Sequence, residues 1–174
     1  MVEFMSYLNN AESNFCLRVN QLSRNYSVRH FFAVVSKLGD GGFWAVMALV
    51  MLWMHGLDAL PAVLQMALTA GFGVLLYKAL KSGLVRERPY MNHYGIHCGT
   101  APLDRYSFPS GHTLHAACFS TMFTALEPAL AIIAVPFAIL VAASRVILGL
   151  HYPSDVIVGA LIGMSLAGVS LSFI

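Results

Sequence analysis

Long apolar runs, separated by short polar breaks, fill the chain from residue 42 to its end. The runs cover about 42–56, 59–80, 110–126, 129–150 and 155–174. A helix needs about 20 mostly apolar residues to cross a bilayer, so most of these runs are long enough. The first run is short and would need a locally thinner bilayer. The pattern predicts an all-α fold, a polytopic transmembrane helix bundle of about five spans, or six.

The composition supports lipid as the surrounding medium. Of the 174 residues, 58% are hydrophobic and 10% are charged, and the mean hydropathy is +0.71. A soluble domain carries about 25% charged residues, which help to cover its surface. The bilayer is therefore the expected partner, whereas a net charge of +2 is too small to indicate nucleic-acid binding. No feature of the sequence identifies a protein partner. Cys16, Cys98 and Cys118 are an odd set without CxxC spacing, so they predict neither a disulfide framework nor a zinc site.

The first 40 residues differ from the rest, because apolar positions there alternate with Asn, Arg and Ser. We interpret residues 1–40 as an N-terminal segment of one or two amphipathic helices lying in the membrane interface. A helix packed against the bundle outside the membrane is the alternative, and an additional crossing within this segment would supply a sixth span. Gly39-Asp40-Gly41-Gly42 interrupts the pattern, so the transmembrane bundle is expected to cover 41–174.

The lengths of the joints predict how the helices connect. Gly56-Leu57-Asp58 and Glu127-Pro128 are tight joints, so the helices on either side of each should be antiparallel. The stretch 81–109 is long, polar and rich in Pro, Gly, His and Tyr, which is typical of a functional loop. With this topology, four regions meet at one membrane face. They lie near residue 81, near 110, at 145–151 and near 155.

That face collects polar residues that lipid tolerates poorly. Lys81 and Arg88 stand near the start of the loop, and Arg145 stands near the end of a later helix. Arginine grips phosphate oxygens with two parallel hydrogen bonds, while lysine supplies a point charge. Ser110 and Gly111 open another helix, where free backbone N–H groups can hold an anion. The set predicts a site for a multiply charged anion, and phosphate is the natural candidate.

Three more residues at this face are of types that catalyse the transfer of a phosphoryl group. His151 follows the end of one helix, and Asp155 begins the next. A carboxylate that holds one ring nitrogen leaves the other nitrogen as a nucleophilic lone pair. His112 lies where it can protonate a leaving alkoxide and then activate water. Together with the cations, these residues predict phosphoryl transfer through a phosphohistidine on His151.

Three sequence blocks carry a family resemblance. They read K-x6-R-P from Lys81, P-S-G-H from Pro109, and S-R-x5-H-x3-D from Ser144. In this order, and without a substitution, the blocks resemble those of the type 2 phosphatidic acid phosphatase superfamily, which also includes the vanadium haloperoxidases. The apolar spans on either side of the blocks agree with this resemblance.

The resemblance implies a role for each matching residue. Phosphate would be bound by Lys81, Arg88, Ser110, Gly111 and Arg145; His151 would attack phosphorus, Asp155 would orient it, His112 would act as acid and then base, and Ser144 would support the site. The resemblance also implies that the enzyme works without a metal or other cofactor. The substrate would be a lipid with a phosphomonoester or pyrophosphate headgroup, such as phosphatidic acid, phosphatidylglycerol phosphate, a polyprenyl pyrophosphate or lipid A.

Two other functions are weighed against this one. A haloperoxidase would hold vanadate in the same site, but that branch of the superfamily is typically soluble and much larger. A non-enzymatic, anion-binding transporter subunit would distribute polar residues through the membrane thickness. Here those residues gather at one end, which favours the phosphatase.

Polar residues outside the three blocks receive structural interpretations. His93 and His97 are four residues apart, but they fall in a predicted loop, where this spacing is weak support for a metal site. His115 is expected to pack or hydrogen-bond within the bundle. Arg86 and Glu87 are expected to pair locally at the water boundary, which contributes little stability.

The expected location is the cell inner (plasma) membrane, with several crossings. The basic residues outside the site all fall on its side of the bundle, and the opposite joints carry none. The positive-inside rule would therefore place the site in the cytoplasm. The family resemblance implies a periplasmic or extracytoplasmic site instead. We favour the family expectation, because joints of two or three residues leave little room for basic residues.

Overall fold

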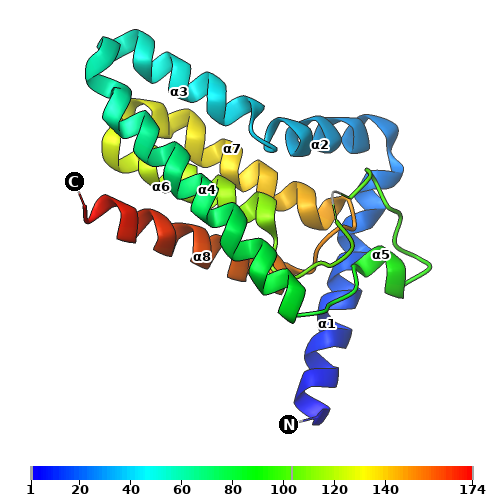
Figure 1. Cartoon of the computed structure of the whole chain (residues 1–174). Helices are drawn as coiled ribbons and strands as arrows, with labels where there is room; N and C mark the ends of the chain where they lie inside the picture. Colours follow the sequence, from blue (N-terminus) through cyan, green and yellow to red (C-terminus); the bar gives the residue numbers. More distant parts are fainter. Residues whose placement is uncertain (1, 103, 174) are drawn as a thin grey trace.

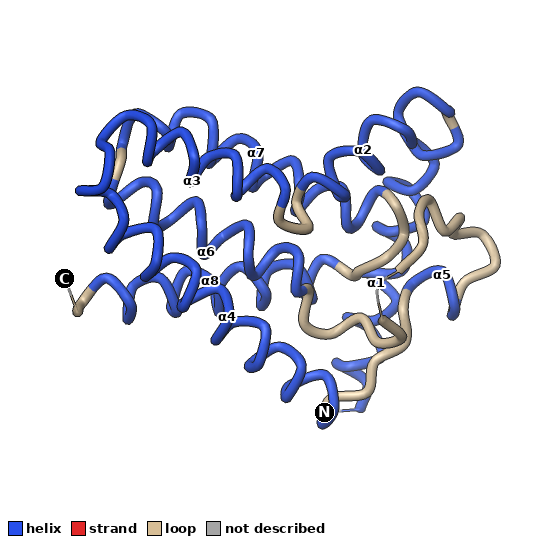
Figure 2. The backbone as a smooth tube through the Cα atoms, turned by 45° about the horizontal axis from the view of Figure 1, so that its top comes forward, coloured by secondary structure: helices blue, strands red, loops and turns tan. Residues whose placement is uncertain are grey.

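Each apolar run forms a helix in the computed structural model, which describes residues 2–102 and 104–173, with side chains from residue 10 onward. All regular elements within these residues are helices (Figure 1; Figure 2), which confirms the predicted all-α fold. In chain order they are α1 (Val2–Asn20), η1 (Gln21–Arg24), α2 (Tyr26–Leu38), α3 (Gly42–His55), η2 (Gly56–Ala59), α4 (Leu60–Gly83), α5 (Pro89–Asn92), α6 (Gly111–Leu126), α7 (Pro128–Ile147) and α8 (Pro153–Leu171).

Prolines mark the starts of three bundle helices. Pro61, Pro128 and Pro153 lie in the first turns of α4, α7 and α8, where a missing N–H costs no helical hydrogen bond. The end of α4 differs from the prediction, because the helix continues to Gly83. Lysine and serine are compatible with a helix, so Lys81 falls in the last turn of α4 and not in the loop.

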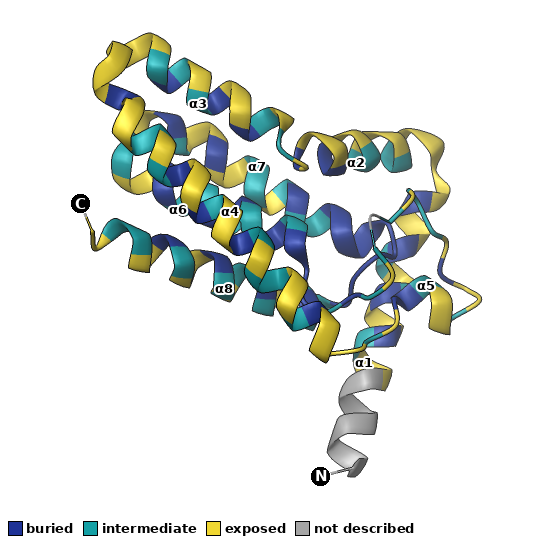
Figure 3. Ribbon diagram, in the orientation of Figure 1, coloured by how far each residue is buried: buried dark blue, intermediate teal, exposed yellow. Residues whose placement is uncertain are grey.

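Three stretches of the described residues are long and apolar enough to cross a membrane. They are Gly42–Gly83, Pro128–Ile147 and Pro153–Leu171. The first stretch contains α3 and α4, which form a hairpin (Figure 1). Trp53 and Ile132 are 86% and 78% exposed, and Figure 3 shows exposed positions along the outer faces of the helices. Lipid would cover such side chains, so the chain is a membrane protein. The number of crossings stays a prediction.

Small residues allow α8 to pack very closely against α6. A Cβ atom at Gly163 would lie 2.1 Å from the carbonyl oxygen of Leu114, and one at Gly159 would lie 2.6 Å from that of Ser110. Glycines four residues apart let two helix backbones approach in this way. The contact brings the start of α6 beside the start of α8, where the Ser110 N–H donates to the carbonyl oxygen of Asp155 at 3.0 Å.

The ends of α4 and α7 and the starts of α6 and α8 lie together at one end of the bundle, as the joint lengths predict (Figure 1). The N-terminal segment forms two helices and a short 3-10 turn. Of these, α1 runs past the same end of the bundle, and α2 packs against α7. The predicted position of α1 and α2 in the membrane interface stays a prediction.

Candidate active site

Lys81, Arg88 and Arg145, here named the cation cage, line one cavity of about 320 Å³. They come from the last turn of α4, the residue before α5 and the last turn of α7. All three side chains are buried. Burying a cation costs free energy unless anions or hydrogen-bond acceptors compensate it. Three cations in one cavity therefore make a strong site for an anion.

His151 presents one ring nitrogen to the cation cage. Its Nε2 atom lies 3.2 Å from Nη1 of Arg88, which also donates to the carbonyl oxygen of Leu150 at 2.9 Å. A guanidinium has no acceptor, so Nε2 must be the accepting nitrogen and the ring proton must lie on Nδ1. Burial, together with the cation cage, holds the pKa of His151 well below its ordinary value. The ring is thus neutral at neutral pH, with the Nε2 lone pair toward the cavity.

The backbone at the end of α7 fixes this position of His151. Gly149 has φ of 73°, in the left-handed region that glycine adopts without strain. The chain turns there, and the N–H groups of Leu150 and His151 both donate to the Arg145 carbonyl oxygen, at 3.0 and 3.1 Å. A Cβ atom on Gly149 would also lie 2.6 Å from Ile96. This turn explains the fixed spacing between Arg145 and His151.

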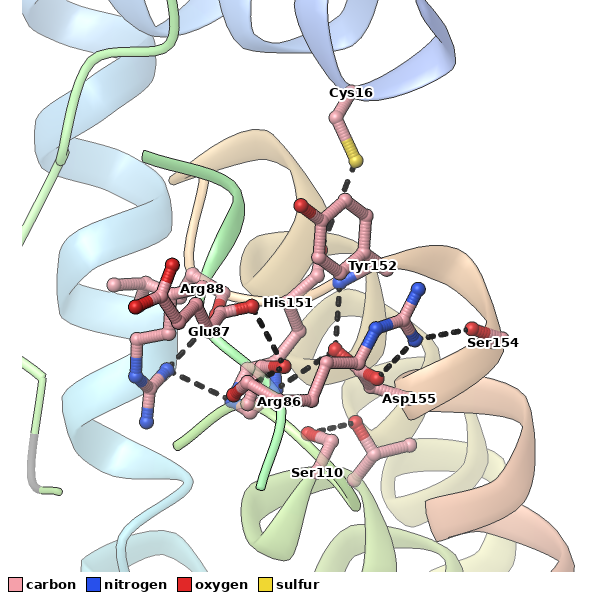
Figure 4. Close-up of polar contacts among 12 residues, drawn as sticks. Cys16, Arg86, Glu87, Arg88, Ser110, His151, Tyr152, Ser154 and Asp155 are labelled. Atoms are coloured by element: carbon pink, nitrogen blue, oxygen red, sulfur yellow. Dashed lines mark hydrogen bonds and ion pairs between the residues drawn. The ribbon is translucent and has the colours of Figure 1, made fainter. Parts of the chain in front are cut away.

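Asp155 lies beside the other ring nitrogen of His151. Its Oδ2 atom is 3.7 Å from Nδ1, which is longer than a hydrogen bond. Oδ2 accepts from the Tyr152 N–H at 2.8 Å, and Oδ1 accepts from Arg86 at 2.6 Å (Figure 4). Nδ1 has no hydrogen-bond partner among the described residues. His151 and Asp155 are therefore neighbours, as predicted, but the hydrogen bonds to the Asp155 carboxylate come from Tyr152 and Arg86.

His112 lies in the first turn of α6 and lines the same cavity as the cation cage. Its Nε2 atom lies within hydrogen-bonding distance of the carboxylate of Asp40, in the loop between α2 and α3. Sequence reasoning missed Asp40 as a site residue, because it appeared only as part of a glycine-rich break. A carboxylate on one nitrogen of His112 orients the ring, which is what a general acid and base requires.

The serines of the motifs are not among the residues that line the cavity, whereas Gly111 is. The Ser110 hydroxyl shares a hydrogen bond of 3.0 Å with Thr113, and the Ser144 hydroxyl donates to the Val141 carbonyl oxygen in its own helix at 2.6 Å. No side chain of the described residues caps the N-terminus of α6. The backbone there retains free N–H groups that suit an anion.

Asp104 is a second residue that the sequence did not reveal. Its carboxylate accepts from Lys81 at 2.6 Å and from Arg88 at 2.8 Å, so it bridges two members of the cation cage. Burial raises the pKa of Asp104, but Lys81 and Arg88 outweigh that effect and hold the pKa below its ordinary value. The Asp104 side chain is therefore an anion. A phosphate that binds both Lys81 and Arg88 would replace this carboxylate as their partner.

The cavity also has an apolar part of its lining. Trp44 from α3, Val74 from α4 and Phe119 from α6 line the same cavity as the cation cage. A molecule that occupied the whole cavity would place an anionic group against the cation cage and an apolar group against these three side chains. The cavity therefore suits an amphiphile.

Several histidines outside the motifs contact other residues of the protein. His93 shares a hydrogen bond of 2.8 Å with Ser13, and His97 lies 3.4 Å from Arg29. As predicted, His115 hydrogen-bonds within the bundle, with its ring nitrogens 2.9 and 3.2 Å from two backbone carbonyl oxygens. No group of three or more potential metal ligands was found among the described residues.

The predicted local pair between Arg86 and Glu87 is wrong. Arg86 instead pairs with Asp155 and with Glu12 of α1, at 2.6 and 2.7 Å. The guanidinium also lies over the Tyr152 ring, 4.1 Å from its centroid. These partners lie far from Arg86 in the sequence, so adjacency was a poor guide to this contact.

Known proteins resemble this chain in sequence and in fold. A family model described as the PAP2 superfamily matches residues 62–174. The chain is 37% identical to the lipid A 1-phosphatase of Rhizobium johnstonii over 100 residues, which are 55% of this chain but 41% of that one. It is 34% identical to the decaprenylphosphoryl-5-phosphoribose phosphatase of Mycobacterium tuberculosis over 133 residues, or 72% and 68% of the two chains.

A solved structure is also similar to this chain in its fold. The crystal structure of a transmembrane PAP2 type phosphatidylglycerolphosphate phosphatase from Bacillus subtilis has a TM-score of 0.72 and 27% identity. The match covers 96% of this chain and 86% of that one. By contrast, the chain spans less than half the length of the Rhizobium relative.

Proposed function

This chain belongs to the PAP2 superfamily, and we propose that it is an integral membrane phosphatase that removes phosphate from lipids. One observation carries the proposal. The cation cage and His151 line the same cavity as Trp44, Val74 and Phe119. Such a cavity matches a molecule with a phosphate at one end and hydrocarbon at the other. A soluble phosphate ester would have no use for the apolar wall.

The proposed reaction has two steps. The cation cage binds the phosphate, and Nε2 of His151 attacks phosphorus, so that a P–N bond forms while the bond from phosphorus to the lipid oxygen breaks. His112 gives its proton to the leaving alkoxide. It then takes a proton from water, whose oxygen attacks phosphorus and displaces His151. Positioning and charge neutralisation supply most of the catalysis in such transfers.

The substrate is proposed to be a lipid phosphomonoester or pyrophosphate. The similar proteins are named for lipid A, decaprenylphosphoryl-5-phosphoribose and phosphatidylglycerolphosphate, which share a phosphate on a lipid and little else. A cage of three cations recognises the phosphate more than the remainder of the molecule. Release of inorganic phosphate from a panel of these lipids, with phosphatidic acid and a polyprenyl pyrophosphate added, would identify the preferred class.

Vanadate is expected to inhibit the purified enzyme, and EDTA is expected to leave its rate unchanged. Vanadate adopts the five-coordinate geometry of phosphoryl transfer and would bind the cation cage and His151. The proposed steps use only side chains and water, so chelation of metal should have no effect. Initial rates on short-chain phosphatidic acid in detergent provide the measurement. Loss of activity in EDTA, restored by a divalent ion, would contradict the proposed chemistry.

We also propose that the protein lies in the inner (plasma) membrane with its site on the extracytoplasmic face. Cys98 offers a test, because Cys16 and Cys118 are buried while Cys98 is half-buried in the loop. Burial raises the pKa of the Cys98 thiol, so labelling should be done at alkaline pH. A membrane-impermeant maleimide is expected to label intact cells, and the Cys98→Ser variant should not be labelled. Labelling only after permeabilisation would place the site in the cytoplasm.

A further inference from the structure

Helix α1 lies outside the region that the family model matches, yet it contacts the candidate active site. Within residues 10–20 of α1, the buried side chains are Ser13, Cys16 and Asn20, which are small or polar. Asn20 donates to the carbonyl oxygens of His97 and Ile147, both at 2.9 Å. These contacts dock α1 against the loops that carry the site residues.

Arg86 connects α1 to the carboxylate beside the nucleophile. Its Nη1 atom donates to Asp155 at 2.6 Å and to the Ser154 hydroxyl at 2.7 Å (Figure 4). Its Nη2 atom donates to Glu12 at 2.7 Å. One guanidinium thus bridges two carboxylates, one from α1 and one from the first turn of α8. Asp155 is completely buried, so it needs a cationic partner to remain ionised.

Both oxygens of the Glu12 carboxylate accept hydrogen bonds. One carboxylate oxygen accepts from Arg86, and the other accepts from the Ser154 N–H at 2.7 Å. The Ser154 N–H lies in the first turn of α8, so it has no carbonyl partner within the helix. The helix dipole also favours a negative charge at this end. Glu12 is 17% exposed and Arg86 is 25% exposed, so water screens their pairing less than it would screen a surface salt bridge.

Charge explains why the second carboxylate matters. A pair of Asp155 and Arg86 alone would be neutral. With Glu12, two carboxylates and one guanidinium leave a net negative charge beside His151. When His151 bonds to phosphorus through Nε2, its ring becomes positively charged. A net negative group next to Nδ1 stabilises that state, whereas a neutral pair stabilises it much less.

We propose that Glu12 is a positioning residue for the reaction, holding Arg86 so that Asp155 stays charged and close to His151. This inference rests on the proposed phosphohistidine chemistry. It extends the functional unit beyond the region that defines the family, to α1. Glu12 itself touches neither the cavity nor the reacting atoms, and it acts only through Arg86 and the start of α8.

Replacement of Glu12 by glutamine is the direct test, because the amide keeps the size of the side chain and removes its charge. We expect kcat on short-chain phosphatidic acid to fall by about 10- to 100-fold, the range for groups that orient a reacting residue. KM should change by less than about twofold, because the cation cage is intact. Ser13→Ala is the matched control, since it removes a neighbouring contact of α1, to His93, and should leave kcat unchanged.

A double variant separates positioning from docking. Arg86→Lys keeps the charge but lacks the planar fork whose two nitrogens bind Asp155 and Glu12 separately, so it should lower kcat to a similar extent. Because Glu12 and Arg86 act on the same carboxylate, Glu12→Gln with Arg86→Lys should cost little more than either change alone. An unchanged kcat in Glu12→Gln, an effect on KM alone, or an equal loss in Ser13→Ala would overturn the inference. Failure of the wild type to release phosphate from any lipid phosphate would instead overturn the proposed function.

Discussion

Replacement of His151 by alanine is expected to abolish turnover of lipid phosphates. Removal of a covalent nucleophile costs roughly 10⁴- to 10⁶-fold in kcat, because the other groups of the site then have no intermediate to stabilise. The structure supports this expectation through the Nε2 lone pair, which points toward Arg88 at 3.2 Å within the cavity. Phosphate release from short-chain phosphatidic acid in detergent gives the measurement.

Loss of activity must be separated from loss of structure, since His151 is buried and alanine would leave a cavity. His151→Gln is the companion variant, because its amide oxygen can still accept a hydrogen bond from Arg88. Both variants should elute from a sizing column like the wild type. The glutamine variant should also retain vanadate binding through the cation cage, although more weakly. A well-folded His151→Gln protein that releases phosphate at the normal rate would refute the nucleophile assignment.

The catalytic face of the bundle could be predicted from the sequence because its determinants are local. Tight joints fix the directions of neighbouring helices, so Lys81, Gly111, Arg145 and Asp155 had to fall at one end. The spacing between Arg145 and His151 likewise reflects one turn, in which both residues share a backbone carbonyl oxygen. Patterns within a few residues of each other were sufficient for this part of the site.

The acidic residues that pair with the basic residues of the site could not be predicted, because only tertiary packing brings the two kinds of residue together. Glu12 is 74 residues from Arg86, and Asp104 is 23 residues from Lys81. Sequence adjacency favoured Glu87 as the partner of Arg86, and the fold places Arg86 against α1 and α8 instead. Arg86 lies inside a recognised block, but at a position that the block leaves unspecified.

The buried face of α1 could not be identified from hydrophobic periodicity either. An amphipathic helix is expected to bury its apolar face, and here the buried positions include Ser13 and Asn20. Their polar atoms bond to His93 and to the backbone carbonyl oxygens of His97 and Ile147, so burial costs little. A helix that packs on irregular loops needs hydrogen-bonding side chains. Its pattern is therefore indistinguishable from that of an interfacial helix.

The second large effect is expected from His112→Ala, and it should depend on the leaving group. A positioned general acid and base contributes about 10²- to 10⁴-fold, and His112 is proposed to act in both steps. With phosphatidic acid, the poor alkoxide leaving group makes the first step slow, so kcat should fall by that factor. With 4-nitrophenyl phosphate the leaving group needs no proton, so the first step should remain fast while hydrolysis of the phosphohistidine stays slow.

The His112→Ala variant should therefore give a burst of 4-nitrophenol close to one equivalent per enzyme, followed by slow turnover. Rapid-quench measurement of the burst, with ³²P label retained on the protein, provides the test. Asp40→Asn is the graded control, because it leaves the ring of His112 in place but removes the carboxylate that orients it. It should slow both steps less than the alanine change. Equal losses on the two substrates without any burst would mean that His112 does not act on the leaving group and the water, and that its contribution is confined to binding phosphate.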